Sequence, residues 1–278
     1  MVQNTCTVTE SAVTQWHPAF FGSLQIEFEK EADKLIFENE HQLSTKPMAI
    51  DVLIIKKISN EPIKKNLGRI FRKHNIIEYK SPEDYLSIDD FYKVYGYTCF
   101  YKYDTQTKDE IKITDITITL VSEGYPRNLI RHLETVRKYK ISKYENGIYY
   151  VTGDIIPIQI IVKKQLSKTE NLWLSSLTNK LRHKEQATQL LRDYNKHRDN
   201  LLYRSVMNTI VTTNSKLFME GNAMCKALEE IMDRKIAEEA ARVNKLTLKL
   251  AELGRMDDII KAAKDPEYQC QLLRDFDL

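Results

Sequence analysis

Short runs rich in β-branched residues recur along the first 165 residues and then stop. The runs lie at 35–44, 49–57, 74–81, 112–122 and 144–164. The last run is typical of a hairpin that turns at a glycine and whose second half is a continuous apolar strand. Apolar runs of this length with few helix formers predict β-strands. Before these runs, apolar residues recur at helical spacing from Pro18 to about Leu35, which predicts a first helix. Ser87 can cap a second helix over 89–102. The chain therefore predicts an α+β fold, in which a central mixed sheet of roughly five or six strands is flanked by helices.

The final part of the sequence has a different composition. From about Leu166 strand signals disappear, and Leu, Ala, Lys, Glu and Arg predominate, apart from a β-branched patch at 209–213. These residues favour helices. A heptad-like pattern is formed by Val243, Leu246, Leu250 and Leu253. It is too short for a coiled coil, so we expect a short packing helix that stops at Gly254 and a last helix that starts at Asp265-Pro266.

Three parts follow from these patterns. We expect a flexible leader at 1–15, a sheet-containing core at 16–165 and an all-helical C-terminal region at 166–278. The helical region is the place where we would expect a homo-oligomer to form, if the chain forms one.

Composition excludes several classes of protein. With 8 Gly and neither a G-x-G-x-x-G nor a P-loop motif, the chain is not expected to bind a nucleotide cofactor. Four scattered cysteines without C-x-x-C spacing indicate neither a zinc cluster nor a secreted disulfide framework. No signal peptide or long apolar run is present, so we expect a cytoplasmic protein without a membrane partner. A net charge of +3 does not by itself indicate a nucleic-acid partner.

Asp51 is the first candidate for a chemical role. It lies inside the apolar run at 49–57, where a carboxylate is costly unless it meets a cation or hydrogen-bond donors. The alternative is an aspartate on an edge strand with water on one side.

Glu78 and Lys80 form the second candidate pair. The two-residue period of a strand places them on one face, and Ile77 and Tyr79 on the other. An ordinary ion pair, worth about 0.2 to 1 kcal/mol, is the alternative. A carboxylate in one strand followed by E-x-K in the next is rarer than either pattern alone.

The order helix, three strands, helix, strand, with Asp51 on the second strand and Glu78-x-Lys80 on the third, resembles the PD-(D/E)XK nuclease superfamily. The resemblance covers roughly 16–164. From Trp173 onward the chain is also similar to the helical part of bacterial recombination-promoting nucleases and putative transposases. Ile50 stands where the superfamily usually has proline.

The resemblance implies a site for Mg²⁺ or Mn²⁺. Mg²⁺ prefers carboxylate and carbonyl oxygens, which Asp51, Glu78 and the Tyr79 carbonyl can supply. Lys80 would then orient or deprotonate a metal-bound water, and orientation is favoured because a lysine beside two carboxylates stays protonated. Many members of the superfamily add a glutamate from the first helix. Here Glu27 is the candidate, with Glu31 one turn further along and a solvated helix flank as the alternative for both.

Two groups of residues are candidates for nucleic-acid contacts. The densest basic cluster precedes the E-x-K strand and contains Lys64, Lys65, Arg69, Arg72, Lys73 and His74. Aromatic and basic residues alternate on the second expected helix, at Tyr92, Lys93, Tyr95, Gly96 and Tyr97. The first group fits phosphate contacts beside the metal, and the second fits backbone contacts or base stacking. A solvated hairpin face and packing against the sheet are the respective alternatives.

These features predict a metal-dependent DNA endonuclease of the recombination or transposition type. A catalytically inactive binding module on the same fold, with DNA or protein as its partner, is the alternative. A structural or assembly protein built on the C-terminal helices is a third class. Retention of Asp51, Glu78 and Lys80 favours the enzyme, because a binding module does not need E-x-K chemistry.

Overall fold

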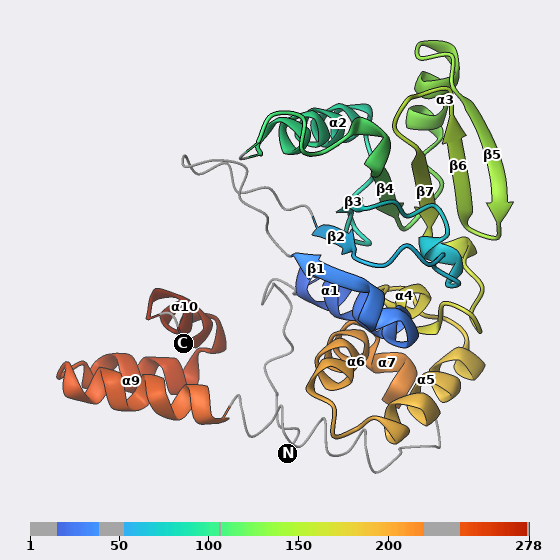
Figure 1. Ribbon diagram of the computed structural model, residues 1–278. Coiled ribbons are helices and arrows are strands. Elements are labelled where there is room, and N and C mark those ends of the chain that lie inside the picture. Colours follow the sequence, from blue (N-terminus) through green and yellow to red (C-terminus); the bar gives the residue numbers. More distant parts are fainter. Residues whose placement is uncertain (1–15, 39–52, 106, 220–239, 277) are drawn as a thin grey trace. The chain divides into compact units, whose positions relative to one another are not determined.

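The computed structural model describes residues 16–38, 53–105, 107–219, 240–276 and 278 (Figure 1). The chain forms two compact units. Of the described residues, those within 16–219 belong to one unit and those within 240–278 belong to the other. The first unit therefore continues beyond residue 165, where the sequence composition changes.

A seven-stranded sheet forms the centre of the larger unit, in the order β1-β2-β3-β4-β7-β6-β5. The strands are β1 Leu35–Glu38, β2 Leu53–Lys57, β3 His74–Tyr79, β4 Ile116–Ser122, β5 Lys140–Glu145, β6 Ile148–Thr152 and β7 Ile158–Val162. β3, β4 and β7 run parallel, and the other neighbouring pairs are antiparallel. The mixed sheet and the α+β class are confirmed. The expected strand number was too low because the hairpin expected at 144–164 begins earlier: β5 starts at Lys140, and the run itself holds the end of β5 together with β6 and β7.

Helices lie on both faces of this sheet (Figure 1). The helices of the larger unit are α1 Trp16–Glu27, α2 Ile88–Tyr103, α3 Arg127–Thr135, α4 Leu172–Ser176, α5 Lys184–Lys196, α6 Leu201–Thr213 and α7 Ser215–Met219. Short 3-10 turns add η1 Glu29–Lys34, η2 Asn66–Gly68, η3 Ile113–Asp115 and η4 Lys163–Gln165. The first expected helix ends early, at Glu27, and α3 lies in a stretch for which the sequence made no prediction. The order α1-β1-β2-β3-α2-β4 is the expected one.

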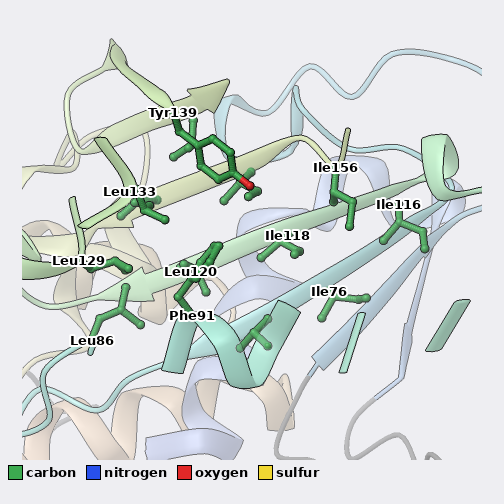
Figure 2. Packing of buried hydrophobic residues seen from close by; sticks show 14 of the residues in the cluster. Ile76, Leu86, Phe91, Ile116, Ile118, Leu120, Leu129, Leu133, Tyr139 and Ile156 are labelled. Carbon is green, nitrogen blue, oxygen red and sulfur yellow. The ribbon is translucent and has the colours of Figure 1, made fainter. Parts of the chain in front are cut away.

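One face of the sheet packs against α2 and α3. Phe91 from α2 and Leu129 and Leu133 from α3 meet Ile118 and Leu120 from β4 in the main hydrophobic core (Figure 2). Alternation along the strands explains this packing, because every second residue of a strand points to the same face. Ile76 also belongs to this core, so the face that carries Ile76 and Glu78 is the α2 face.

The opposite face packs against α1. Phe20 of α1 stacks on Tyr79 of β3 with ring centroids 4.1 Å apart, and Phe28 stacks on Phe71. α1 also contacts α4 and α6, which ties these later helices to the sheet. Composition alone therefore did not mark the boundary of the compact unit.

The smaller unit contains a helix over residues 240–252, then α9 Met256–Lys264 and α10 Pro266–Asp275. Its core is formed by Leu246, Leu250, Ala262, Leu272 and Leu273. Two expectations are confirmed: Gly254 adopts a φ of +70° after the first of these helices, and the Asp265 side chain accepts hydrogen bonds at the start of α10. None of the helices in the described ranges is long and apolar enough to cross a membrane.

Candidate active site at the carboxyl end of β3

Glu78 and Lys80 lie where β3 ends, beside the parallel strand β4. Glu78 pairs with Leu120 of β4, and the Lys80 amide donates to the Val121 carbonyl. The Lys80 ammonium lies 3.3 Å from Glu78 Oε1. The acid and the base thus share one face, as the strand period predicts. Carboxyl ends of parallel strands are frequent places for ligand sites in open α/β sheets.

Asp90 completes this cluster from the first turn of α2. The Lys80 ammonium lies 2.7 Å from Asp90 Oδ1, closer than it lies to Glu78. Asp90 is held by a capping box. Its amide donates to Ser87 Oγ at 3.0 Å, and its Oδ2 accepts from the Ser87 amide at 2.8 Å. The Ser87 cap was expected, but the contact from Asp90 to Lys80 was not. The sequence offered one signal for it, an acidic residue three positions after a capping serine.

The protein environment disfavours the charged form of Glu78 and favours the charged form of Lys80. Glu78 is 3% exposed, and its Oε2 has no hydrogen-bond partner among the described residues. Burial raises the pKa of Glu78, while Lys80 and then Lys93 oppose that rise. Burial also acts to lower the pKa of Lys80, but the hydrogen bond to Asp90 and the charge of Glu78 raise it overall. The cluster therefore combines a firmly charged lysine with a carboxylate that burial disfavours.

Tyr79 points away from this pair. Its ring stacks on Phe20 on the α1 face, and its hydroxyl accepts from the fully buried Lys163 at 3.3 Å. Lys163 follows β7, and Glu123, whose Oε2 lies 3.2 Å from the Lys163 ammonium, follows β4. The sequence analysis missed both residues. Their signal was a charged residue directly after each of two buried strands.

The side chains at the end of β3 include oxygen donors of the kind that a magnesium ion prefers. Glu78 offers a hard carboxylate oxygen that lacks a partner, which suits Mg²⁺ or Mn²⁺. Asp51 lies outside the described residues. Within the described ranges no group of three or more His, Cys, Asp and Glu side chains converges as a metal site. Glu78 fits the ion, and the remaining ligands of the expected set are Asp51 and the Tyr79 carbonyl.

The structure does not bring Glu27 to Glu78. Glu27 lies on α1, across the sheet from Glu78, and both of its carboxylate oxygens are engaged. Oε1 accepts from the Leu174 amide at 3.0 Å, and Oε2 lies 2.5 Å from the Lys65 ammonium. Burial raises the pKa of Glu27, and Lys65 opposes that rise. Glu31 does not replace it, because its carboxylate accepts from the backbone amides of Lys64 and Lys65.

The basic cluster does not lie beside Glu78. It precedes β3 at His74, and the rise of a strand puts Lys73 about 16 Å from Glu78. Most of its side chains have partners within the protein. Arg69 bonds Tyr144 and Glu145, and Arg72 bonds the Thr114 carbonyl. Lys65 pairs with Glu27, Lys73 pairs with Asp115 and His74 bonds Tyr101. The ion pairs of Arg69 with Glu145 and of Lys73 with Asp115 are exposed and therefore weak. Arg69 and Lys73 thus remain available for phosphate contacts at the surface.

The residues of α2 proposed for nucleic-acid contacts separate into two groups. The Tyr95 hydroxyl donates to both oxygens of Asp154 at 3.1 Å, so Tyr95 packs as a structural residue. Tyr92 is 41% exposed and bonds His132 of α3. Lys93 lies over the ring of Tyr97 at 5.6 Å and is exposed. Only the exposed Tyr92 and Lys93 stay available for contacts beside the Glu78 site.

Comparison of the chain with protein-family models, curated proteins and solved structures gives no match. The functional assignment therefore rests on the residues and their geometry.

Proposed function

We propose that the protein is a metal-dependent endonuclease that hydrolyses DNA phosphodiester bonds at the Glu78–Lys80 pair. The observation that carries this proposal is the buried Glu78 carboxylate, which has one oxygen without a described hydrogen-bond partner and a lysine 3.3 Å from the other. A buried carboxylate with a raised pKa costs stability, and such groups are concentrated at functional sites. The order of helices and strands around it supports the same reading through the PD-(D/E)XK resemblance.

The chemistry divides among the residues of the cluster. Glu78, with Asp51 and the Tyr79 carbonyl, would hold the ion, which supplies a nucleophilic water and stabilises charge on the scissile phosphate. Lys80 keeps its proton because Asp90 and Glu78 raise its pKa, so it orients the water and stabilises negative charge. Asp90 is a positioning residue, since it fixes Lys80 through a carboxylate that the Ser87 cap already holds.

A plasmid-nicking assay with Mg²⁺ or Mn²⁺, run beside gel-shift titrations of DNA, tests this proposal. Lys80→Ala should lower cleavage by about 100-fold or more and leave DNA affinity nearly unchanged, because one ammonium acts at the reacting centre. Asp51→Ala should abolish cleavage as well.

Lys56→Ala is the matched control. Lys56 also belongs to an ion pair, 2.5 Å from Glu38, but it stands opposite His74 at the other end of β3. The control should cleave like wild type. Cleavage by Lys80→Ala at the wild-type rate would refute a catalytic role for Lys80.

The second candidate is a nucleic-acid or protein binding module that keeps the fold without catalysis. It is favoured by the close contact of Lys80 with Asp90, because a lysine neutralised in this way is also typical of a structural ion pair. Binding of DNA without any nicking in either metal would support this candidate over the enzyme.

A further inference from the structure

A cavity of about 900 Å³ lies on the α1 side of the larger unit, away from the Glu78 pair. Its wall is formed by the end of α1 with η1, the turn at 64–65, residues 169–173, α5 and Tyr203 of α6. The side chains of Ile26, Leu172 and Trp173 contribute apolar surface. This volume is within the range typical of small-molecule sites.

Five acidic side chains line the cavity, and each of them accepts a hydrogen bond within the protein, the longest being that from Asn66 Nδ2 to Glu170 Oε2 at 3.5 Å. Glu27 pairs with Lys65, and Glu31 accepts from two backbone amides. Glu29 accepts from the Tyr203 hydroxyl at 2.8 Å, and Asp193 accepts from the Trp173 indole at 2.9 Å. Glu27 is the one carboxylate of this set with an ion pair among the described residues, and the other four accept from neutral donors.

Four basic side chains of the same wall have no hydrogen-bond or ion-pair partner among the described residues. They are Lys30, Lys64, Arg192 and Lys196. They come from three separate segments: η1, the turn before η2, and α5. The wall carries six Lys and Arg side chains against five Asp and Glu side chains. The four basic groups without a described partner keep their N–H donors available for a bound anion.

We infer that this cavity is a binding site for a phosphate-bearing small molecule with more than one negative charge. Phosphate oxygens accept charge-assisted hydrogen bonds from ammonium and guanidinium groups, which are stronger than neutral ones. The apolar wall at Trp173 accommodates the organic part of such a molecule. The site lies on the α1 face, so it does not depend on the proposed nuclease site on the α2 face.

Calorimetric titration with pyrophosphate tests the inference. The titration is done in EDTA, so that a divalent ion at Glu78 cannot contribute. Wild type should bind, and the double variant Arg192→Ala/Lys196→Ala should bind about tenfold more weakly or worse, since it removes two groups that donate charge-assisted hydrogen bonds to phosphate. Both residues are exposed and alanine favours helices, so the variant should fold.

The matched control is Arg131→Ala/Lys140→Ala, which removes the same charge at exposed positions outside the cavity. It should bind pyrophosphate like wild type, and so should Glu78→Gln. The inference is overturned if wild type does not bind or if the control loses as much affinity as the cavity variant. A 5′-phosphorylated oligonucleotide shows whether the phosphate belongs to a nucleic-acid end or to a free small molecule. If the oligonucleotide competes with pyrophosphate, the site binds a nucleic-acid end. If it does not compete, the site binds a free small molecule.

Discussion

Glu78→Gln should make the protein more stable at neutral pH. Glu78 is 3% exposed with one oxygen unpartnered, and burial of an incompletely bonded polar group costs about 1–3 kcal/mol. Glutamine keeps the shape and removes the charge. The substitution also removes the ion pair with Lys80. Because Lys80 is 19% exposed and keeps its ion pair with Asp90, this loss lowers the free energy of unfolding by at most about 1 kcal/mol. The net gain lies between about 0 and 3 kcal/mol, with a midpoint of about 1.5 kcal/mol, or roughly 3–6 °C in melting temperature.

The gain should depend on pH in a defined direction. The folded state raises the pKa of Glu78 above its ordinary 4.5, so protonation favours folding. Below pH 4.5 the carboxyl is neutral in both states, and the variant has no advantage. As pH rises through the folded pKa, wild type loses this stability and Glu78→Gln does not. Urea denaturation from pH 4 to pH 8 measures the difference.

Asp154→Asn is the matched control of opposite sign. The Asp154 side chain is 5% exposed but accepts from Tyr95, Tyr139, Arg137 and the Ile156 amide. Although burial acts to raise its pKa, these hydrogen bonds lower it overall. Asparagine there should destabilise the fold. If Glu78→Gln also destabilises it at pH 7, Glu78 is a structural ion-pair partner and the reasoning fails.

Three further perturbations test the surroundings of the site. Burial lowers the pKa of Lys163 from 10.5 to about 8, so between these pH values the unfolded chain binds a proton that the folded chain lacks. The stability of wild type relative to Lys163→Met should therefore rise over this range in guanidinium titrations, and a flat difference would contradict it. Ser87→Ala should cost about 1 kcal/mol in urea denaturation, because it removes the cap that holds Asp90; a change near zero would show that the cap is dispensable. Phe91→Ala should cost about 3–5 kcal/mol by thermal melting, since Phe91 is 1% exposed in the main core; a cost under 1 kcal/mol would contradict the packing.

Local patterns in the sequence predicted most of the fold. Period-two alternation located the strands, and the residues Ser87, Gly254 and Asp265 correctly marked helix ends. The start of β5 was not located, because Lys140–Glu145 is mostly exposed and its sequence KISKYE lacks an apolar alternation. The extent of the larger unit was also not readable, since it depends on contacts of α1 with α4 and α6.

The candidate site was predicted only in part. Glu78 and Lys80 share a strand, so their common face follows from the strand period alone. The position of Glu27 away from Glu78 could not be predicted, because helical spacing shows which residues share a face of α1 but not which face of the sheet α1 covers. The Lys163–Glu123 pair was missed for a related reason. It needs the order of β4 and β7, which are distant in sequence and adjacent in the sheet.

The central claim is that Glu78 is kept in an unfavourable environment because it binds a divalent metal ion. Calorimetric titration of Mn²⁺ into wild type and into Glu78→Gln tests this claim without relying on DNA or on turnover. We expect wild type to bind Mn²⁺, and Glu78→Gln, which folds and melts at a higher temperature, to lose that binding. Equal binding by the two proteins, or no binding by wild type at millimolar Mn²⁺, would contradict the claim.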